Sequence, residues 1–299
     1  MDYIKVADDL RFSRVIAGFM RAADAKMEPG DLLRFTQECL DMGITTMDHA
    51  DIYGNYQCEK LFGEAVLKQM PELRDQMQIV TKCDIVLPGR SESGSIYYTA
   101  EPEHIIHSVE RSLKNLHTDH VDVLLLHRPD YLMHPEKTAG ALEKLQKEGK
   151  VRYFGVSNCL PLQFDMLNSY LSTPLVTNQI HISPASLEAF DNGSIDHALL
   201  RRIPLMAWSP LDGGKILRDS SPASLRLREK MEQIAEQHNV DEITKVMYAW
   251  LYQIPARVCA VTGSMKIKHV EAAVEACSLT LSHAEWYAIL EASRGYPVP

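Results

Sequence analysis

The stretch "VDVLLLH", residues 121–127, decides the fold class, because its apolar residues do not alternate with polar ones. A strand with one wet face alternates apolar and polar residues, whereas a strand of a parallel sheet covered on both faces is apolar throughout. Comparable short runs, rich in leucine or β-branched residues, occupy residues 14–19, 44–48, 77–83, 151–157, 176–182, 204–210 and 257–263. The sequence therefore predicts eight buried strands.

Amphipathic segments separate these runs. Apolar residues recur with helical spacing in residues 31–42, 103–116, 138–150 and 223–238. Eight strand–helix units in one chain predict an α/β fold, a (β/α)8 TIM barrel, as a single domain over residues 1–299. A doubly wound sheet is the weaker alternative, because no G-x-G-x-x-G motif follows the first strand.

The N-terminal residues form a separate pattern. Residues 3–13, "YIKVADDLRFS", predict a β-hairpin that turns at Asp8 and Asp9. Because this segment precedes the first barrel strand, we expect the hairpin to close the barrel floor.

Composition restricts the class of protein. Apolar residues make up 45% and charged residues 24% of the chain, which is typical of a soluble globular enzyme. The net charge of −9 disfavours nucleic acid and anionic membranes as partners. The charged N-terminus shows no apolar leader, so a cytoplasmic location is expected. Six scattered cysteines without a C-x-x-C pair predict neither a disulfide framework nor a metal site.

Polar and aromatic residues stand where the predicted strands end. In a TIM barrel these ends face a common mouth, which holds the active site. A single polar strand end is usually only the start of a loop, so it is their joint occurrence that indicates a site. The residues are Gly18, Asp48, Lys82, His127, Ser157, Asn158, Gln179, Trp208, Ser209, Gly263 and Ser264.

Three of the mouth residues, together with Tyr53 from the turn after residues 44–48, suggest acid catalysis. Tyrosine, with an ordinary pKa of about 10, is a poor acid at neutral pH, so a catalytic Tyr53 needs a cation beside it. Lys82, at the end of the next strand, is placed to supply that cation, and Asp48 is placed to pair with Lys82. His127 would add a neutral donor to a carbonyl oxygen. The neighbouring His49 and Asp51 are expected to be loop and capping residues.

Ordered motifs along nearly the whole chain resemble the aldo-keto reductase family. They are "MDHADIYG" (47–54), "IVTKC" (79–83), "VDVLLLHRPD" (121–130), "GKVRYFGVSN" (149–158), "TNQI" (177–180), "AWSPLDGG" (207–214) and "VTGS" (261–264). The wording "DHADIYG", "HRPD" and "MAWS" is similar to the bacterial YdhF-like oxidoreductase branch. The resemblance implies a catalytic tetrad of Asp48, Tyr53, Lys82 and His127, with Tyr53 donating a proton to the carbonyl and NADPH donating the hydride.

The resemblance also implies an NADPH site. Ser157, Asn158 and Gln179 would hold the nicotinamide carboxamide, Trp208 would stack on the ring, and residues 209–217 would wrap the pyrophosphate. The full expected set is Gly18, Phe19, Met20, Asp48, Ser157, Asn158, Gln179, Trp208, Ser209, Pro210, Leu211, Gly213, Gly214, Gly263, Ser264, Lys268 and His269.

The expected site for the 2′-phosphate departs from the family pattern. Gly263 replaces a lysine and His269 replaces an arginine that many members carry. Ser264 remains, and Lys266 and Lys268 either compensate or are solvated lysines. NADPH is the expected cofactor, with NADH as a weaker alternative.

Substrate contacts are less strongly indicated. Met20 stands where a substrate-facing tryptophan is common in the family. The segment 87–102 is long for a loop of a βα unit and holds Tyr97 and Tyr98, which are candidate substrate contacts.

Three functions remain open from the sequence. The first is an NADPH-dependent reductase of aldehydes or ketones, with a small-molecule carbonyl as its substrate. The second is a barrel lyase or isomerase in which Lys82 forms a Schiff base. The third is a nicotinamide-binding sensor or regulatory subunit with vestigial catalysis. The oligomeric state is open as well.

Overall fold

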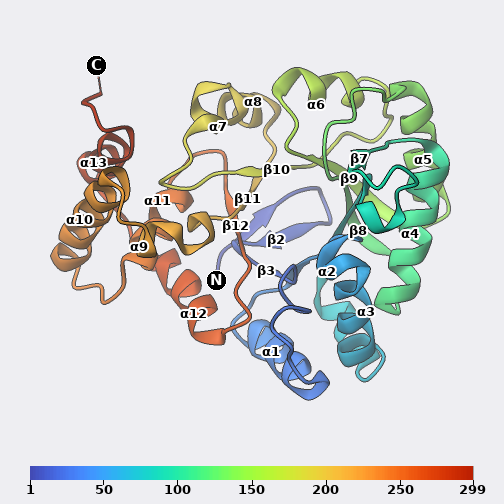
Figure 1. Cartoon of the computed structure of the whole chain (residues 1–299), viewed down its shortest axis with the longest axis horizontal. Coiled ribbons are helices and arrows are strands. Elements are labelled where there is room, and N and C mark those ends of the chain that lie inside the picture. The colour runs from blue at the N-terminus through green and yellow to red at the C-terminus, as the bar shows by residue number, and fades with distance from the viewer. Residues whose placement is uncertain (299) are drawn as a thin grey trace.

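A computed structural model describes residues 1–298, and its centre is a closed barrel of eight parallel strands (Figure 1). Each strand lies inside one of the eight predicted runs, and β12 pairs with β3 to close the barrel. The prediction of a TIM barrel is therefore confirmed. The strands are β3 (Val15–Gly18), β4 (Thr46–Asp48), β5 (Gln78–Cys83), β8 (Val121–Leu126), β9 (Val151–Ser157), β10 (Asn178–His181), β11 (Leu205–Trp208) and β12 (Cys259–Thr262).

Helices surround the barrel on all sides (Figure 1). They are α1 (Pro29–Asp41), α2 (Tyr53–Tyr56), α3 (Cys58–Phe62), α4 (Pro102–Leu116), α5 (Pro135–Lys147), α6 (Pro161–Asn168), α7 (Glu188–Asp191), α8 (Ser194–Arg201), α9 (Lys215–Arg218), α10 (Pro222–Gln237), α11 (Ile243–Tyr252), α12 (Ile267–Glu275) and α13 (His283–Arg294). The four predicted helices correspond to α1, α4, α5 and α10. Each begins earlier than predicted, at a proline, because proline suits the first helical position, where its missing N–H costs nothing. Among residues 1–298, no helix has the length and apolarity needed to cross a membrane.

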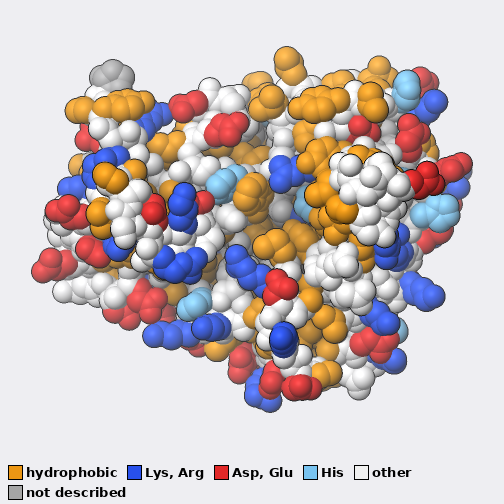
Figure 2. Space-filling model, in the orientation of Figure 1, with side chains coloured by type: hydrophobic (Ala, Val, Ile, Leu, Met, Phe, Trp, Pro, Cys, Tyr) orange, Lys and Arg blue, Asp and Glu red, His pale blue; other side chains and the backbone are white. Residues whose placement is uncertain are grey.

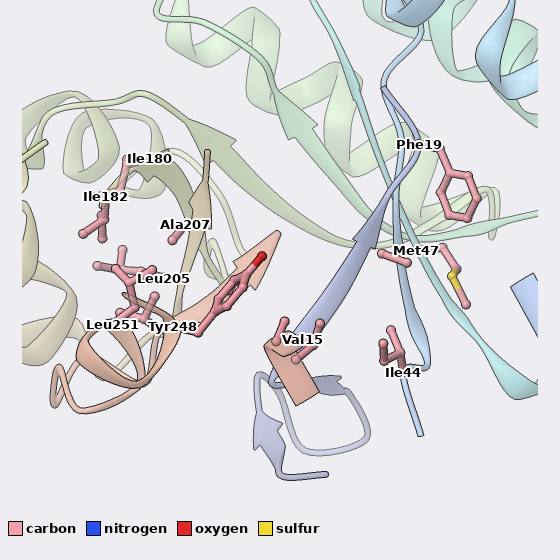
Figure 3. Packing of buried hydrophobic residues seen from close by; sticks show 14 of the residues in the cluster. Val15, Phe19, Ile44, Met47, Ile180, Ile182, Leu205, Ala207, Tyr248 and Leu251 are labelled. Carbon is pink, nitrogen blue, oxygen red and sulfur yellow. The ribbon is translucent and has the colours of Figure 1, made fainter. Parts of the chain in front are cut away.

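Two apolar layers, one between the strands and the helices and one inside the barrel, explain why the strand sequences are unbroken apolar runs. Along β8, Leu124 and Leu126 pack outward against the helices, whereas Val123 and Leu125 point into the barrel. Adjacent side chains of a strand face opposite sides, so both faces of β8 are buried. Figure 3 shows part of the outer layer, in which Val15 and Met47 project from the strands.

The N-terminal hairpin closes the barrel floor, as predicted. Strands β1 (Tyr3–Lys5) and β2 (Arg11–Ser13) pair antiparallel, with Ile4 opposite Phe12. Ile4, Leu10 and Phe12 pack against the side chains that fill the barrel interior. This leaves the opposite end of the barrel, where the strands end, as its open mouth.

The long segment after β5 forms a second hairpin. Strand β6 (Ile85–Val86) pairs antiparallel with β7 (Tyr97–Tyr98). Both tyrosines of β7 are exposed. The segment therefore has regular structure of its own beside the mouth.

The floor hairpin should contribute strongly to stability through Phe12, which is fully buried. Truncating a buried phenylalanine removes apolar contacts and leaves a cavity, so Phe12→Ala should lower the free energy of unfolding by about 3–5 kcal/mol. Chemical denaturation would measure this loss. The neighbouring Arg11 is exposed, so Arg11→Ala is a matched control with a change below about 0.5 kcal/mol. Equal effects of the two substitutions would show that the hairpin does not seal the floor.

Candidate active site

The site is centred on the ammonium group of Lys82, which is completely buried. Its Nζ donates to Asp48 Oδ1 at 2.7 Å and Oδ2 at 2.9 Å, to the backbone oxygen of His49 at 2.7 Å and to Tyr53 Oη at 3.0 Å. An ammonium has three protons, so the carboxylate, the carbonyl and the phenol use all of them. Lys82 on β5, Asp48 on β4 and Tyr53 at the start of α2 are thus brought together, as the sequence predicted.

This arrangement sets the protonation states of Lys82 and Tyr53. Burial favours the neutral amine, but Asp48 and Tyr53 outweigh it and raise the pKa of Lys82 above its ordinary value. Burial also raises the pKa of Tyr53, while Lys82 opposes this rise and Asp48 adds to it. Tyr53 is therefore a neutral phenol at neutral pH, and Lys82 is a cation that stabilises the phenolate if it forms.

His127 completes the group. Its ring lies 5.9 Å from that of Tyr53, centroid to centroid, at 80°. Burial, together with the positive charges of Lys82 and Arg128, lowers the pKa of His127 well below its ordinary value. The imidazole is therefore neutral, and it can donate a hydrogen bond without carrying a charge.

A left-handed turn presents Tyr53 to the mouth. Gly54 and Asn55 have φ values of 57° and 53°. A Cβ on Gly54 would lie 2.6 Å from Cys58 Sγ and 2.7 Å from Ala23 Cβ. Glycine is needed here both for the backbone conformation and for space. The "YG" pair of the sequence motif thus has a physical reason.

His49 and Asp51 lie in the loop after β4, as predicted, but neither caps a helix. The His49 ring is fully buried, stacked on Phe19 at 4.8 Å and edge-on to Phe62 at 4.6 Å. Asp51 is buried too and accepts a hydrogen bond from Arg111 at 2.9 Å. The expectation of capping was wrong, because apolar rings and an arginine from distant segments converge on this loop.

The predicted nicotinamide residues form one connected network. Ser157 Oγ accepts from Asn158 Nδ2 at 2.8 Å, and Asn158 Oδ1 accepts from Trp208 Nε1 at 2.9 Å. Gln179 Nε2 donates to Asp48 Oδ1 at 2.8 Å, which joins this network to the Lys82 group. The structure therefore brings the two predicted sets together at one mouth.

The predicted residues after β3 differ in their accessibility. Gly18 has no room for a side chain, because a Cβ would lie 2.9 Å from the Thr262 backbone oxygen. Met20 is 44% exposed. Phe19, by contrast, is fully buried among Phe35, His49 and Phe62, so its side chain is part of the core.

The loop after β11 makes tight turns at several predicted cofactor residues. Ser209, Gly213 and Gly214 have φ values of 49°, 62° and 77°. Pro210 and Leu211 connect them, and a Cβ added to Gly213 would meet no other atom within 4 Å. The backbone at Gly213 is therefore open to close approach by a ligand, whereas a Cβ on Gly214 would lie 3.2 Å from the Arg218 guanidinium.

Of the residues predicted to bind the 2′-phosphate, Ser264 and His269 lie together, whereas Lys268 is paired elsewhere. Ser264 Oγ and His269 Nδ1 lie 2.9 Å apart, and both residues are exposed or half-buried at the start of α12. Lys268 instead pairs with Glu242 at 3.5 Å. One contact was not predicted from the sequence: Arg21 donates to the Gly263 backbone oxygen at 3.0 Å. No local pattern links residues so far apart in the chain.

Comparison with known proteins agrees with this picture. A sequence model of the Aldo/keto reductase family matches residues 14–294. Oxidoreductase YdhF of Escherichia coli is 45% identical, over 96% of both chains. The 6-dehydroglucose reductase of Agrobacterium fabrum is 39% identical, over the full length of both chains. The structure of the glycerol dehydrogenase AKR11B4 from Gluconobacter oxydans is similar in fold, with a TM-score of 0.86, 24% identity and coverage of 100% of this chain and 97% of that one.

The burial of His49 should make stability depend on pH. Burial, with the charge of Lys82, lowers the pKa of His49 to about 3, whereas an unfolded histidine titrates near 6.5. The unfolded chain therefore binds a proton that the folded chain rejects, and stability falls as pH decreases from about 6.5 towards 3. His49→Phe should remove this loss, gaining relative to the original chain about 1.4 kcal/mol per pH unit below 6.

Urea denaturation across this pH range would measure the effect. His283 is exposed, so His283→Phe is the control and should leave the pH profile unchanged. Parallel pH profiles for the original chain and His49→Phe would contradict the assignment.

Proposed function

The chain belongs to the aldo/keto reductase family, and from that premise we propose that it is an NADPH-dependent oxidoreductase that reduces aldehydes or ketones to alcohols. The observation that carries this proposal is the contact of Lys82 Nζ with both Asp48 and Tyr53 Oη. We treat residues 1–299 as one catalytic domain that acts on a small-molecule carbonyl. The 6-dehydroglucose reductases among its relatives are named for such a reduction.

In the proposed reaction, Tyr53 Oη and the His127 ring bind the substrate carbonyl oxygen. A bound NADPH, held by Ser157, Asn158, Gln179 and Trp208, would supply the hydride for the new C–H bond. Tyr53 donates its proton to the oxygen as the C=O π bond breaks, and its phenolate is held by Lys82 until solvent returns the proton. Lys82 thus stabilises the negative charge of the Tyr53 phenolate, which exists only during the reaction. An interaction that is stronger during the reaction than before it accelerates the chemical step.

The chain has groups that suit the nicotinamide. The side-chain nitrogen of Gln179 is held by Asp48, while its side-chain oxygen makes no hydrogen bond within residues 1–298. That oxygen is free to accept from the carboxamide amine. Ser157 and Asn158 would hold the other side of the carboxamide, and Trp208 would cover the ring.

The Schiff-base alternative is disfavoured by the same geometry. A lysine nucleophile must be neutral and free to attack. The pKa of Lys82 is instead raised, so its side chain is a cation. All three of its N–H groups donate hydrogen bonds. The alternative of a sensor with vestigial catalysis predicts the same contacts. Only a measurement of turnover separates it from the reductase.

Substitution of Tyr53 tests the proposal. Tyr53→Phe removes the proton donor and keeps the ring, so NADPH oxidation with a panel of aldehydes and ketones should fall by about 10²–10⁴. Cofactor affinity, followed by fluorescence, should hardly change. Tyr170 is an exposed tyrosine on the surface, so Tyr170→Phe is the control. Full turnover by Tyr53→Phe would refute the role of Tyr53, and no turnover by the original chain on any carbonyl would favour the sensor.

The cofactor preference rests on Ser264 and His269. Without a guanidinium at residue 269, discrimination between NADPH and NADH should be modest. We therefore expect His269→Arg to tighten NADPH by about tenfold or more, because a charge-assisted hydrogen bond contributes roughly 1.5–3 kcal/mol. NADH affinity should stay constant. Dissociation constants for both cofactors decide the point, and equal changes would place His269 away from the 2′-phosphate.

A further inference from the structure

Arg128 stands out among the arginines of the chain. It follows His127 directly at the end of β8 and is half-buried. Its guanidinium makes no hydrogen bond, ion pair or ring contact with any residue in 1–298. Every other half-buried arginine donates from its guanidinium to a carboxylate or a carbonyl: Arg14, Arg74, Arg111, Arg152, Arg228, Arg257 and Arg294.

Two acids of this region, Asp84 and Asp130, already accept hydrogen bonds from backbone N–H groups. Both carboxylate oxygens of Asp84 accept the backbone N–H of Arg128, at 3.1 Å. Asp130 accepts the backbone N–H groups of Ala100 and Leu132, each at 2.9 Å. These bonds fix the backbone that carries Arg128 and leave its side chain without a counter-ion. Withdrawing a guanidinium from water without a partner costs free energy, so a bound anion would offset that cost.

Arg128 is next to the proposed reaction centre in the chain, because it directly follows His127, whose backbone oxygen accepts from Asn158 Nδ2 at 3.3 Å. Arg128 is one of the charges that hold down the pKa of the neighbouring His127. The segment that follows the hairpin of β6 and β7 meets this loop, because the backbone N–H of Ala100 donates to Asp130 Oδ2 at 2.9 Å. Tyr97, on β7, is 47% exposed. Positive and apolar side chains gather around the hollowed centre of the face in Figure 2.

We propose that Arg128 binds a carboxylate on the carbonyl substrate while Tyr53 and His127 hold its carbonyl oxygen. The substrate class is thus an aldehyde or ketone that also carries a carboxylate. A planar guanidinium pairs with a carboxylate through two parallel hydrogen bonds, which an ammonium cannot reproduce. This inference rests on the proposed reductase function and specifies its substrate.

Two substrates of the same shape test the inference. Para-carboxybenzaldehyde and para-formylbenzamide differ in charge but hardly in size. Replacing Arg128 by methionine should lower kcat/KM for the carboxylate by about tenfold or more and change kcat/KM for the amide by less than about twofold. Arg128→Lys should recover only part of the loss. Arg202 is exposed, its side chain makes no hydrogen bond or ion pair within residues 1–298, and it precedes β11 at the floor end, so Arg202→Met is the control and should change neither value.

A binding measurement separates failure of this inference from failure of the proposed function. Calorimetry with para-(hydroxymethyl)benzoate and its amide, in the presence of NADP⁺ and again without it, needs no turnover. Tighter binding of the benzoate that Arg128→Met abolishes would support the inference even if the chain reduced no carbonyl. Equal losses for the charged and neutral compounds, or an equal loss with glyceraldehyde, would overturn it and assign Arg128 to packing or to hydroxyl groups.

Discussion

The buried ion pair of Lys82 and Asp48 is the constraint on which the site depends. A fully buried ammonium is tolerable only when all its protons are donated, so the positions of Asp48, the His49 carbonyl and Tyr53 are fixed together. Removing any one of these acceptors would leave an uncompensated charge or an unused donor in the core. The free energy spent on burying the pair therefore fixes the position of the Tyr53 hydroxyl.

The barrel supplies the rigidity that this pair requires. Asp48 lies on β4 and accepts from Gln179 on β10, and these two strands are not neighbours in the sheet. The hydrogen bond therefore crosses the mouth and couples the Lys82 group to the predicted nicotinamide residues. On β5, Thr81 faces outward and donates to the buried Glu59 at 2.6 Å, while the adjacent Lys82 faces inward. Because adjacent side chains of β5 face opposite sides, Thr81 makes a structural contact with Glu59 outside the barrel, while Lys82 takes part in the proposed chemistry inside it.

Behind the mouth lies a second group of buried polar side chains. Burial raises the pKa of Asp51 to about 6, although Arg111 opposes the rise, and burial raises the pKa of Glu59 to about 7. His49 and Asp51 lie in the segment between β4 and Tyr53, and Glu59 follows on α3. The segment that carries Tyr53 is therefore held by the contact of Lys82 with Tyr53 and by the contact of Arg111 with Asp51.

The sequence by itself determined the barrel, its eight strands and the approach of Asp48, Lys82, His127 and Tyr53. Strands buried on both faces are unbroken apolar runs in the sequence, and parallel strands of a closed barrel bring their ends to one mouth. Only the tertiary structure decided that Phe19 and His49 pack in the core, that Asp51 pairs with Arg111, and that the Arg128 guanidinium has no hydrogen bond or ion pair within residues 1–298. These outcomes depend on which distant side chains meet after folding, and such contacts leave no periodic or local pattern in the chain.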